Sequence, residues 1–179
     1  MPNQSLDLKP VDRITAGAIG EPGKREFYIQ ARKGRRLVTL KCEKEHVLAL
    51  ALAIDQFLLS LAENDPDTVA AAGPAIQGDM ALEVPLEPLF HAGEVGLGYD
   101  QVGERVVVIL HEQLEEGEAE EGVRPSVVRF WATPAQMRAF CLHAQEVVAG
   151  GRPRCSMCGE PIEPEGHFCP RKNGDRTHD

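Results

Sequence analysis

Short apolar runs, each bounded by glycine, proline or charged residues, characterise the first part of the chain. They are rich in β-branched or aromatic residues, which predicts three strands joined by hairpins. These runs lie at residues 14–19, 27–31 and 37–41. From Glu43 to Ala62, apolar residues instead recur every three or four positions. That spacing predicts a helix with one buried face.

The second half of the chain repeats this order of elements. Three further strands are predicted at residues 95–99, 105–110 and 126–131. The helix that follows has a clear start, because Thr133 is suited to the N-cap and Pro134 to the first helical position. Gln136 stands three residues after the cap, as in a capping box. The helix is expected to end at Gly150.

The two halves align at a shift of ninety residues, for example Val38 with Val128 and Leu40 with Phe130. We therefore predict an α+β fold in which duplicated βββα units form antiparallel sheet with two helices on one face. The alternative is a chance similarity between two amphipathic hairpin–helix segments.

The predicted domain division follows from these units. A domain at residues 1–151 contains units at about 10–62 and 94–150, and residues 152–179 form a separate tail. Residues 63–93 are rich in proline, alanine and glycine and are expected to be a connection over the surface.

The tail contains four good metal ligands in the order Cys155, Cys158, His167 and Cys169. A Cys-x2-Cys pair followed by Gly159 can form a tight turn that directs both sulfurs at one ion. If residues 167–169 are extended, His167 and Cys169 point to the same side. The spacing predicts a structural, zinc-ribbon-like Zn²⁺ site of the Cys3His type.

Other interpretations of the tail stay open. His178 could replace His167 as the fourth ligand. A redox role for Cys155 and Cys158 requires a helix start after the first cysteine, which Gly159 and Pro161 disfavour. Nucleic-acid binding by the tail would use its basic residues, with Phe168 as a stacking ring.

The charge distribution argues against nucleic acid as a main partner. The chain has a net charge of −9, and residues 152–179 carry as many acidic as basic side chains, so the excess belongs to residues 1–151. An acidic body repels phosphate groups, including those of anionic membranes. The apolar run at 47–61 is interrupted by Asp55 and Gln56 and is expected to be too short for a bilayer.

The compartment is expected to be the cytoplasm. The start of the chain has no apolar segment typical of a secretory signal. Three of the five cysteines belong to the predicted metal site. Cys42 and Cys141 are isolated among apolar residues, so core packing is expected for both. This usage is typical of a reducing compartment.

No convergent catalytic motif is present in the sequence, and we do not predict an enzyme. The alternative is an enzyme with a pocket between the two βββα units, using His91 or His111 with Glu112. For a lone histidine at the end of an apolar strand, a structural role is the more common one.

Two segments resemble an uncharacterised bacterial family found in Actinobacteria and Chloroflexi. They are the ending Cys155-x-x-Cys158-Gly-x-Pro-Ile-x-Pro-x-Gly-His167-x-Cys169-Pro-Arg-x-Asn-Gly174 and the segment Arg25-x-Phe-Tyr-x-Gln-Ala31. The resemblance implies a gene neighbourhood with histidine-phosphatase-like and phosphatidylinositol-kinase-like proteins. It therefore implies a protein partner and no assigned reaction. The tail and this resemblance together lead us to expect a zinc-binding protein that acts as a binding or adaptor module. The sequence makes no prediction of its oligomeric state.

Overall fold

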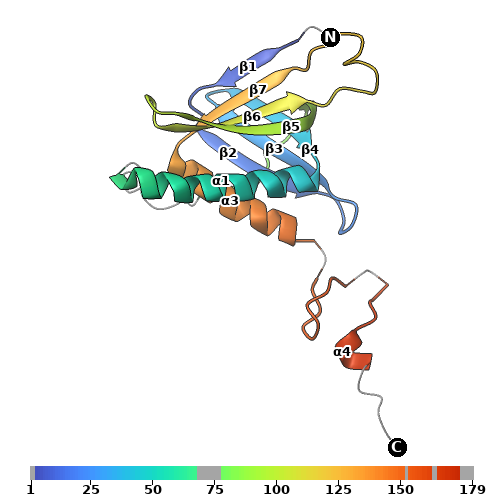
Figure 1. The fold of residues 1–179 in the computed structure, drawn as a ribbon. Coiled ribbons are helices and arrows are strands. Elements are labelled where there is room, and N and C mark those ends of the chain that lie inside the picture. Colours follow the sequence, from blue (N-terminus) through green and yellow to red (C-terminus); the bar gives the residue numbers. More distant parts are fainter. Residues whose placement is uncertain (1–2, 68–77, 152, 163–164, 174–179) are drawn as a thin grey trace, which may run out of the picture.

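The computed structural model describes residues 3–67, 78–151, 153–162 and 165–173. These residues form one seven-stranded sheet and two long helices (Figure 1), so the predicted α+β class is confirmed. The elements in chain order are β1 (Ser5–Leu8), β2 (Arg13–Ile19), β3 (Glu26–Lys33), β4 (Arg36–Cys42), α1 (Lys44–Asn64), β5 (Pro88–Asp100), β6 (Arg105–Glu112), β7 (Val127–Ala132), α3 (Pro134–Ala149) and α4 (Pro170–Asn173).

The sheet is mixed, with the strand order β1-β7-β6-β5-β4-β3-β2. Strands β2 to β4 and strands β5 to β7 pair antiparallel, as the hairpins predicted. The pairs β4–β5 and β1–β7 are parallel, so the expectation of a wholly antiparallel sheet is wrong at these two joins. Helix α1 lies between β4 and β5 in the chain, and a crossover of this kind brings the next strand back in the same direction.

The sheet is strongly curved. Strands β1 and β2 occupy opposite edges, yet only residues 9–12 connect them. In a flat sheet, seven strands spaced about 4.8 Å apart would separate the edges by roughly 29 Å. The connection spans at most about 18 Å, so the edges must approach each other. Within it, Val11 N donates to Trp131 O and Asp12 N donates to Arg32 O, both at 2.8 Å.

Helices α1 and α3 lie side by side against the sheet (Figure 1) and close the hydrophobic core. The capping box predicted for α3 is confirmed: Gln136 N donates to Thr133 Oγ1 at 3.1 Å, and Thr133 N donates to Gln136 Oε1 at 2.9 Å. The largest fully buried side chains include Ile29, Leu40, Ile54, Leu110, Phe130, Met137 and Phe140.

Both halves contain three antiparallel strands followed by a helix. Strand β1 falls outside this plan and was not predicted. It covers four residues, and its partner β7 lies more than a hundred residues further along the chain. Whether the halves arose by duplication stays a prediction.

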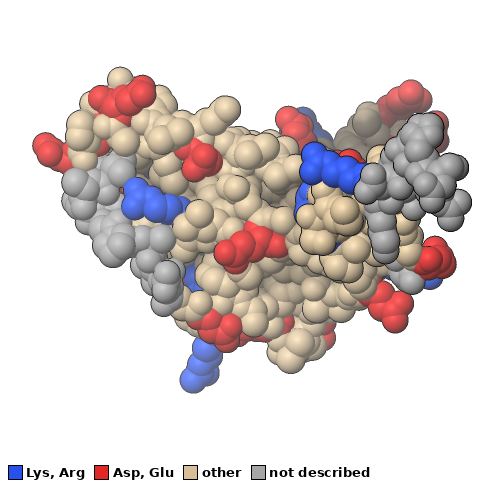
Figure 2. Space-filling view, turned by 90° about the horizontal axis from the view of Figure 1, so that it is seen from below, with Lys and Arg blue, Asp and Glu red and all other residues tan. Residues whose placement is uncertain are grey.

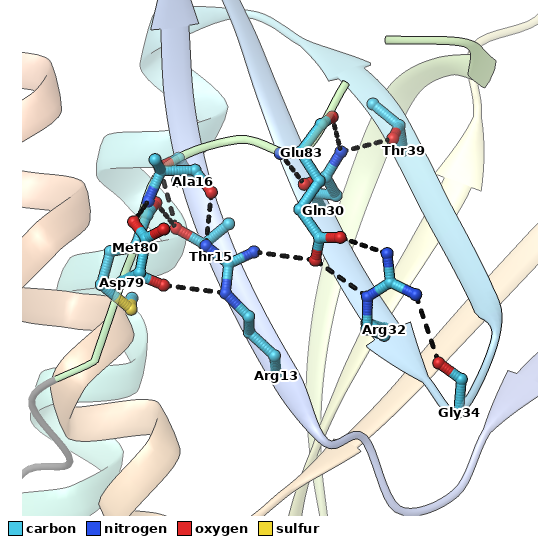
Figure 3. Close-up of polar contacts among 11 residues, drawn as sticks. Arg13, Thr15, Ala16, Gln30, Arg32, Gly34, Thr39, Asp79, Met80 and Glu83 are labelled. Carbon is cyan, nitrogen blue, oxygen red and sulfur yellow. Dashed lines mark hydrogen bonds and ion pairs between the residues drawn. The ribbon is translucent and has the colours of Figure 1, made fainter. Parts of the chain in front are cut away.

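The expected connection at 63–93 is only partly correct. Helix α1 continues to Asn64 and β5 begins at Pro88, so both ends of this range belong to regular elements. Residues 79–84, which we call the docked segment, are held by side chains of β2 and β3 (Figure 3). A Cβ atom at Gly17 would overlap Leu82 of this segment, so glycine at that position gives Leu82 its space.

Buried polar groups fix the docked segment. Gln30, which has no exposed surface, accepts from Glu83 N at 2.8 Å and donates to Glu83 O at 3.0 Å. Thr15 Oγ1 donates to Met80 O at 2.6 Å. The Glu83 carboxylate pairs with Arg32 and with Arg13 (Figure 3). The hydrogen bond from Arg32 lowers the pKa of Glu83 below its ordinary value.

By length and composition, α1 is the one helix among the described residues that could cross a membrane. The expectation that the apolar run at 47–61 is too short for a bilayer stays a prediction, because this helix extends beyond that run at both ends. Its most apolar window is 28% buried within the chain. The buried side consists of Val47, Leu50, Ala51, Ile54, Leu58 and Leu61.

Candidate metal centre

The four predicted ligands of the tail lie together. One ligand atom from each of Cys155, Cys158, His167 and Cys169 lies within 4.8 Å of all the others. Cys155 Sγ is 3.8 Å from Cys169 Sγ, and Cys158 Sγ is 3.3 Å from His167 Nε2. Three thiols and one imidazole at these distances can bind a metal ion.

The local backbone explains how the first two ligands converge. Cys155 N donates to Glu160 O at 2.8 Å, and Gly159 N donates to Cys155 O at 2.9 Å. Gly159 has a φ angle of +77°, which residues with a side chain rarely adopt. The chain therefore turns tightly between Cys155 and Cys158, as the Cys-x2-Cys-Gly pattern predicted.

The other two ligands come from the chain just before α4. Gly166, with a φ angle of +97°, directs the chain into His167 and Cys169. Cys169 is 4% exposed and immediately precedes α4. Arg171 Nη1 donates to Met157 O at 2.8 Å, which joins this part of the tail to the turn. His178, the alternative fourth ligand, lies outside the described residues.

The electrostatics of the cluster favour a thiolate at Cys155. The backbone amides of Cys158 and Met157 lower the pKa of Cys155 to about 6. The Glu160 amide lowers the pKa of Cys158, whereas burial and the sulfurs of Cys155 and Cys169 raise it. The raising effects are larger in sum, so the pKa of Cys158 lies above its ordinary value. Metal ligation requires the thiolate form, which Cys155 adopts more readily than Cys158.

The two remaining cysteines belong to the core. Cys42 is 3% exposed and Cys141 is 2% exposed. Burial raises the pKa of each thiol to about 12. Cys141 Sγ also donates to Ala51 O at 3.3 Å. Packing, as expected from the sequence, accounts for both positions.

Among the described residues, the cavity that His91 lines does not contain the other residues of the alternative enzymatic prediction. Glu112 accepts from Ser126 N at 3.0 Å. His91 Nε2 instead lies 3.0 Å from Glu43 Oε1, within ion-pair distance but outside hydrogen-bond geometry. His91 and Glu43 line a cavity of about 700 Å³. His46 also lines this cavity, but His111 and Glu112 do not. Sequence reasoning missed His46, whose only signal is its position in the first turn of a helix.

The segment Arg25-x-Phe-Tyr-x-Gln-Ala31 has a structural role. Arg25 donates to Val147 O at 2.9 Å and to Gly150 O at 2.6 Å, so it caps the C-terminus of α3. Its guanidinium carbon also lies 4.9 Å from the centre of the Phe27 ring. Gln30 holds the docked segment. These residues connect β3 to elements far away in sequence.

Comparison with known proteins gives one match. No curated protein and no solved structure matches the chain. The model of one family, described as "Protein of unknown function (DUF3090)", matches residues 6–169. This range includes β1 except its first residue, β2 to β7, both long helices and all four residues of the Cys/His cluster. The chain therefore belongs to the DUF3090 family.

Proposed function

We propose that this protein is a cytoplasmic zinc-binding protein that acts as a binding or adaptor module for another protein. The observation that carries the proposal is the convergence of Cys155, Cys158, His167 and Cys169 within 4.8 Å. In this proposal the tail, held by its zinc ion, binds the partner protein, and the α+β body carries the tail.

Zinc suits this set of ligands. A tetrahedral ion with zinc–sulfur bonds of about 2.3 Å places two sulfurs roughly 3.8 Å apart. The Sγ atoms of Cys155 and Cys169 lie 3.8 Å apart. Three sulfurs and one nitrogen fill all four positions of such an ion, so water and substrate have no place on it. The proposed role of zinc is therefore structural.

The partner-binding role is supported by two exposed side chains of the tail. Phe168, between the ligands His167 and Cys169, is 76% exposed, and Met157, between Cys155 and Cys158, is 47% exposed. Aromatic residues and methionine are enriched in protein interfaces. A zinc ion would hold both at a fixed distance from each other. The family resemblance makes bacterial histidine-phosphatase-like and phosphatidylinositol-kinase-like proteins the candidate partners.

The metal is tested by elemental analysis of purified protein. We expect about one zinc per chain in the wild type and a large loss in Cys158→Ser. Ser156→Ala, in the same turn but without a ligand, is the matched control and should keep its zinc. Absence of zinc from freshly reduced wild type would contradict the proposal.

The partner is tested by capture of the two candidate proteins on immobilised full-length chain. Phe168→Ala should reduce capture while zinc content stays unchanged. Val102→Ala, at a side chain that is 99% exposed in the turn after β5, is the control. Capture that is equal in both variants would contradict a role for the tail. Binding of single-stranded DNA instead would favour the nucleic-acid alternative.

A further inference from the structure

The outer side of α1 is unusually apolar. Leu48, Leu52 and Leu59 are 37%, 49% and 62% exposed. Steps of four and seven residues place them in one row along the helix. Between Glu45 and Glu63, the only Asp, Glu, Lys or Arg is Asp55.

This row is separate from the side of α1 that packs on the body. A helix on the surface of a globular protein has one apolar face and one polar face. The apolar face of α1 is already buried on α3 and the sheet. A second apolar side, as on α1, is typical of a helix that also packs against another molecule.

Helix α3 extends the same surface. Its Leu142 is 56% exposed, and the neighbouring Cys141 contacts Ala51 of α1. Seen from the helix side, the molecule has a broad uncharged area with charged side chains mostly toward its edges (Figure 2). We call the surface formed by Leu48, Leu52, Leu59 and Leu142 the helix-layer surface.

The charges around the helix-layer surface indicate the chemistry of its partner. Asp55 lies within the leucine row, Glu45 and Glu63 lie at its ends, and Glu146 is exposed on α3; Lys44 before Leu48 and the half-buried Arg138 before Leu142 are basic, so these acidic side chains outnumber these basic ones. The chain as a whole carries a net charge of −9. A second copy would place two acidic surfaces against each other, and an anionic membrane would be repelled in the same way. A basic partner is complementary.

We propose that the helix-layer surface docks a helix of a partner protein that carries a row of large aliphatic residues flanked by lysine or arginine. The leucine row of α1 packs against the aliphatic row, and Glu45, Asp55 and Glu63 face the basic residues. The inference rests on the proposed protein-binding function but uses a surface other than the metal-binding tail.

The test uses two synthetic amphipathic helices of about 18 residues. Both carry the same leucine stripe, and all their remaining positions are lysine in one peptide and glutamate in the other. Binding to zinc-loaded, full-length protein is measured by fluorescence anisotropy. We expect the lysine peptide to bind and the glutamate peptide not to bind. Leu52→Gln/Leu59→Gln should weaken binding of the lysine peptide by at least about ten-fold, since two apolar contacts are lost.

Matched variants separate this surface from other effects. Leu89→Gln changes a leucine on β5 that is 46% exposed and should leave peptide binding unchanged. Asp55→Lys should weaken binding of the lysine peptide and permit binding of the glutamate peptide. Cys158→Ser should lose zinc but keep the peptide, so failure of the metal proposal and failure of this one are distinguishable. Thermal unfolding of each variant establishes that it is folded.

Three outcomes would overturn the inference. The first is equal binding of the lysine peptide to wild type and to Leu52→Gln/Leu59→Gln. The second is a wild-type dimer in analytical ultracentrifugation that becomes monomeric in the same variant, because the occupant would then be a second copy. The third is co-sedimentation of the wild type, but not of this variant, with phosphatidylcholine–phosphatidylglycerol vesicles.

Discussion

The side-chain amide of Gln30 pairs with both backbone groups of Glu83. Glu83 N donates to Gln30 Oε1 at 2.8 Å, and Gln30 Nε2 donates to Glu83 O at 3.0 Å. Gln30 therefore acts as a neighbouring strand would, over the length of one residue. A side chain on β3 thus anchors a segment that lies about fifty residues further along the chain.

Replacing Gln30 tests this anchor. Gln30→Leu preserves approximate volume but leaves the backbone groups of Glu83 and the hydroxyl of Thr39 without this partner. We expect a loss of about 2–3 kcal/mol in the free energy of unfolding, measured by urea denaturation. Gln101→Leu, at an exposed position in the turn after β5, is the control. An equal loss in both variants would contradict the anchoring role.

The ion pair of Glu83 predicts a dependence of stability on pH. Because the hydrogen bond from Arg32 lowers the pKa of Glu83 in the folded chain, the carboxylate stabilises the fold above its ordinary pKa of 4.5. This contribution is lost as the pH falls through the folded value. Glu83→Gln should therefore melt below wild type at neutral pH, and the difference should shrink in acid.

Melting temperatures of wild type and Glu83→Gln between about pH 7 and pH 3 measure this effect. Glu120→Gln, in the exposed acidic loop after β6, serves as the control for removing one acidic group. A constant difference between wild type and Glu83→Gln over this range would show that the ion pair contributes nothing to the pH dependence.

Arg25 predicts a second stability effect, at the end of α3. Arg25→Ala removes the donor to the Val147 and Gly150 carbonyls and should cost about 1–2 kcal/mol. Arg25→Lys should recover little of it, because an ammonium group lacks the planar fork of guanidinium. Urea denaturation gives the energies, with Arg36→Ala as an exposed control. Full recovery in Arg25→Lys would mean that charge alone matters.

The five cysteines should differ in reactivity. With a pKa of about 12, Cys42 and Cys141 are thiolate in only about one molecule in ten thousand at pH 8. Iodoacetamide should therefore modify none of the five in the metal-loaded protein, three after a chelator is added, and all five after denaturation. Mass spectrometry counts the additions. Rapid labelling of Cys42 or Cys141 in the folded chain would contradict their burial.

Local patterns predicted the fold where the interactions are local. The capping box of Thr133 and Gln136 and the turns between antiparallel strands depend on neighbouring residues, so the sequence indicates them directly. Strand β1 alternates polar and apolar residues, but over only four positions, which is the lower limit for recognising a strand period, and its partner lies far along the chain. The docked segment depends on polar pairs across long sequence distances, such as Gln30 with Glu83, and polar pairing has no sequence period at all.

The same distinction applies to the candidate sites. Cys155, Cys158, His167 and Cys169 lie within fifteen residues, and glycine turns bring them together, so spacing was sufficient to predict the cluster. The cavity beside α1 combines His46 of that helix with His91 of β5. The two histidines lie close together because β5 pairs with β4 in parallel. The sequence predicted antiparallel sheet, so it did not predict this cavity.

The parallel pairing of β1 with β7 has a consequence for synthesis of the chain. Ser5–Leu8 leaves the ribosome before the other strands of the sheet, but its partner strand ends at Ala132. Strand β1 must therefore wait until β7 has been translated before the sheet can be completed. The meander β2–β4 and helix α1 can form during this interval, and the N-terminal strand then joins a sheet that has already been built from the other edge.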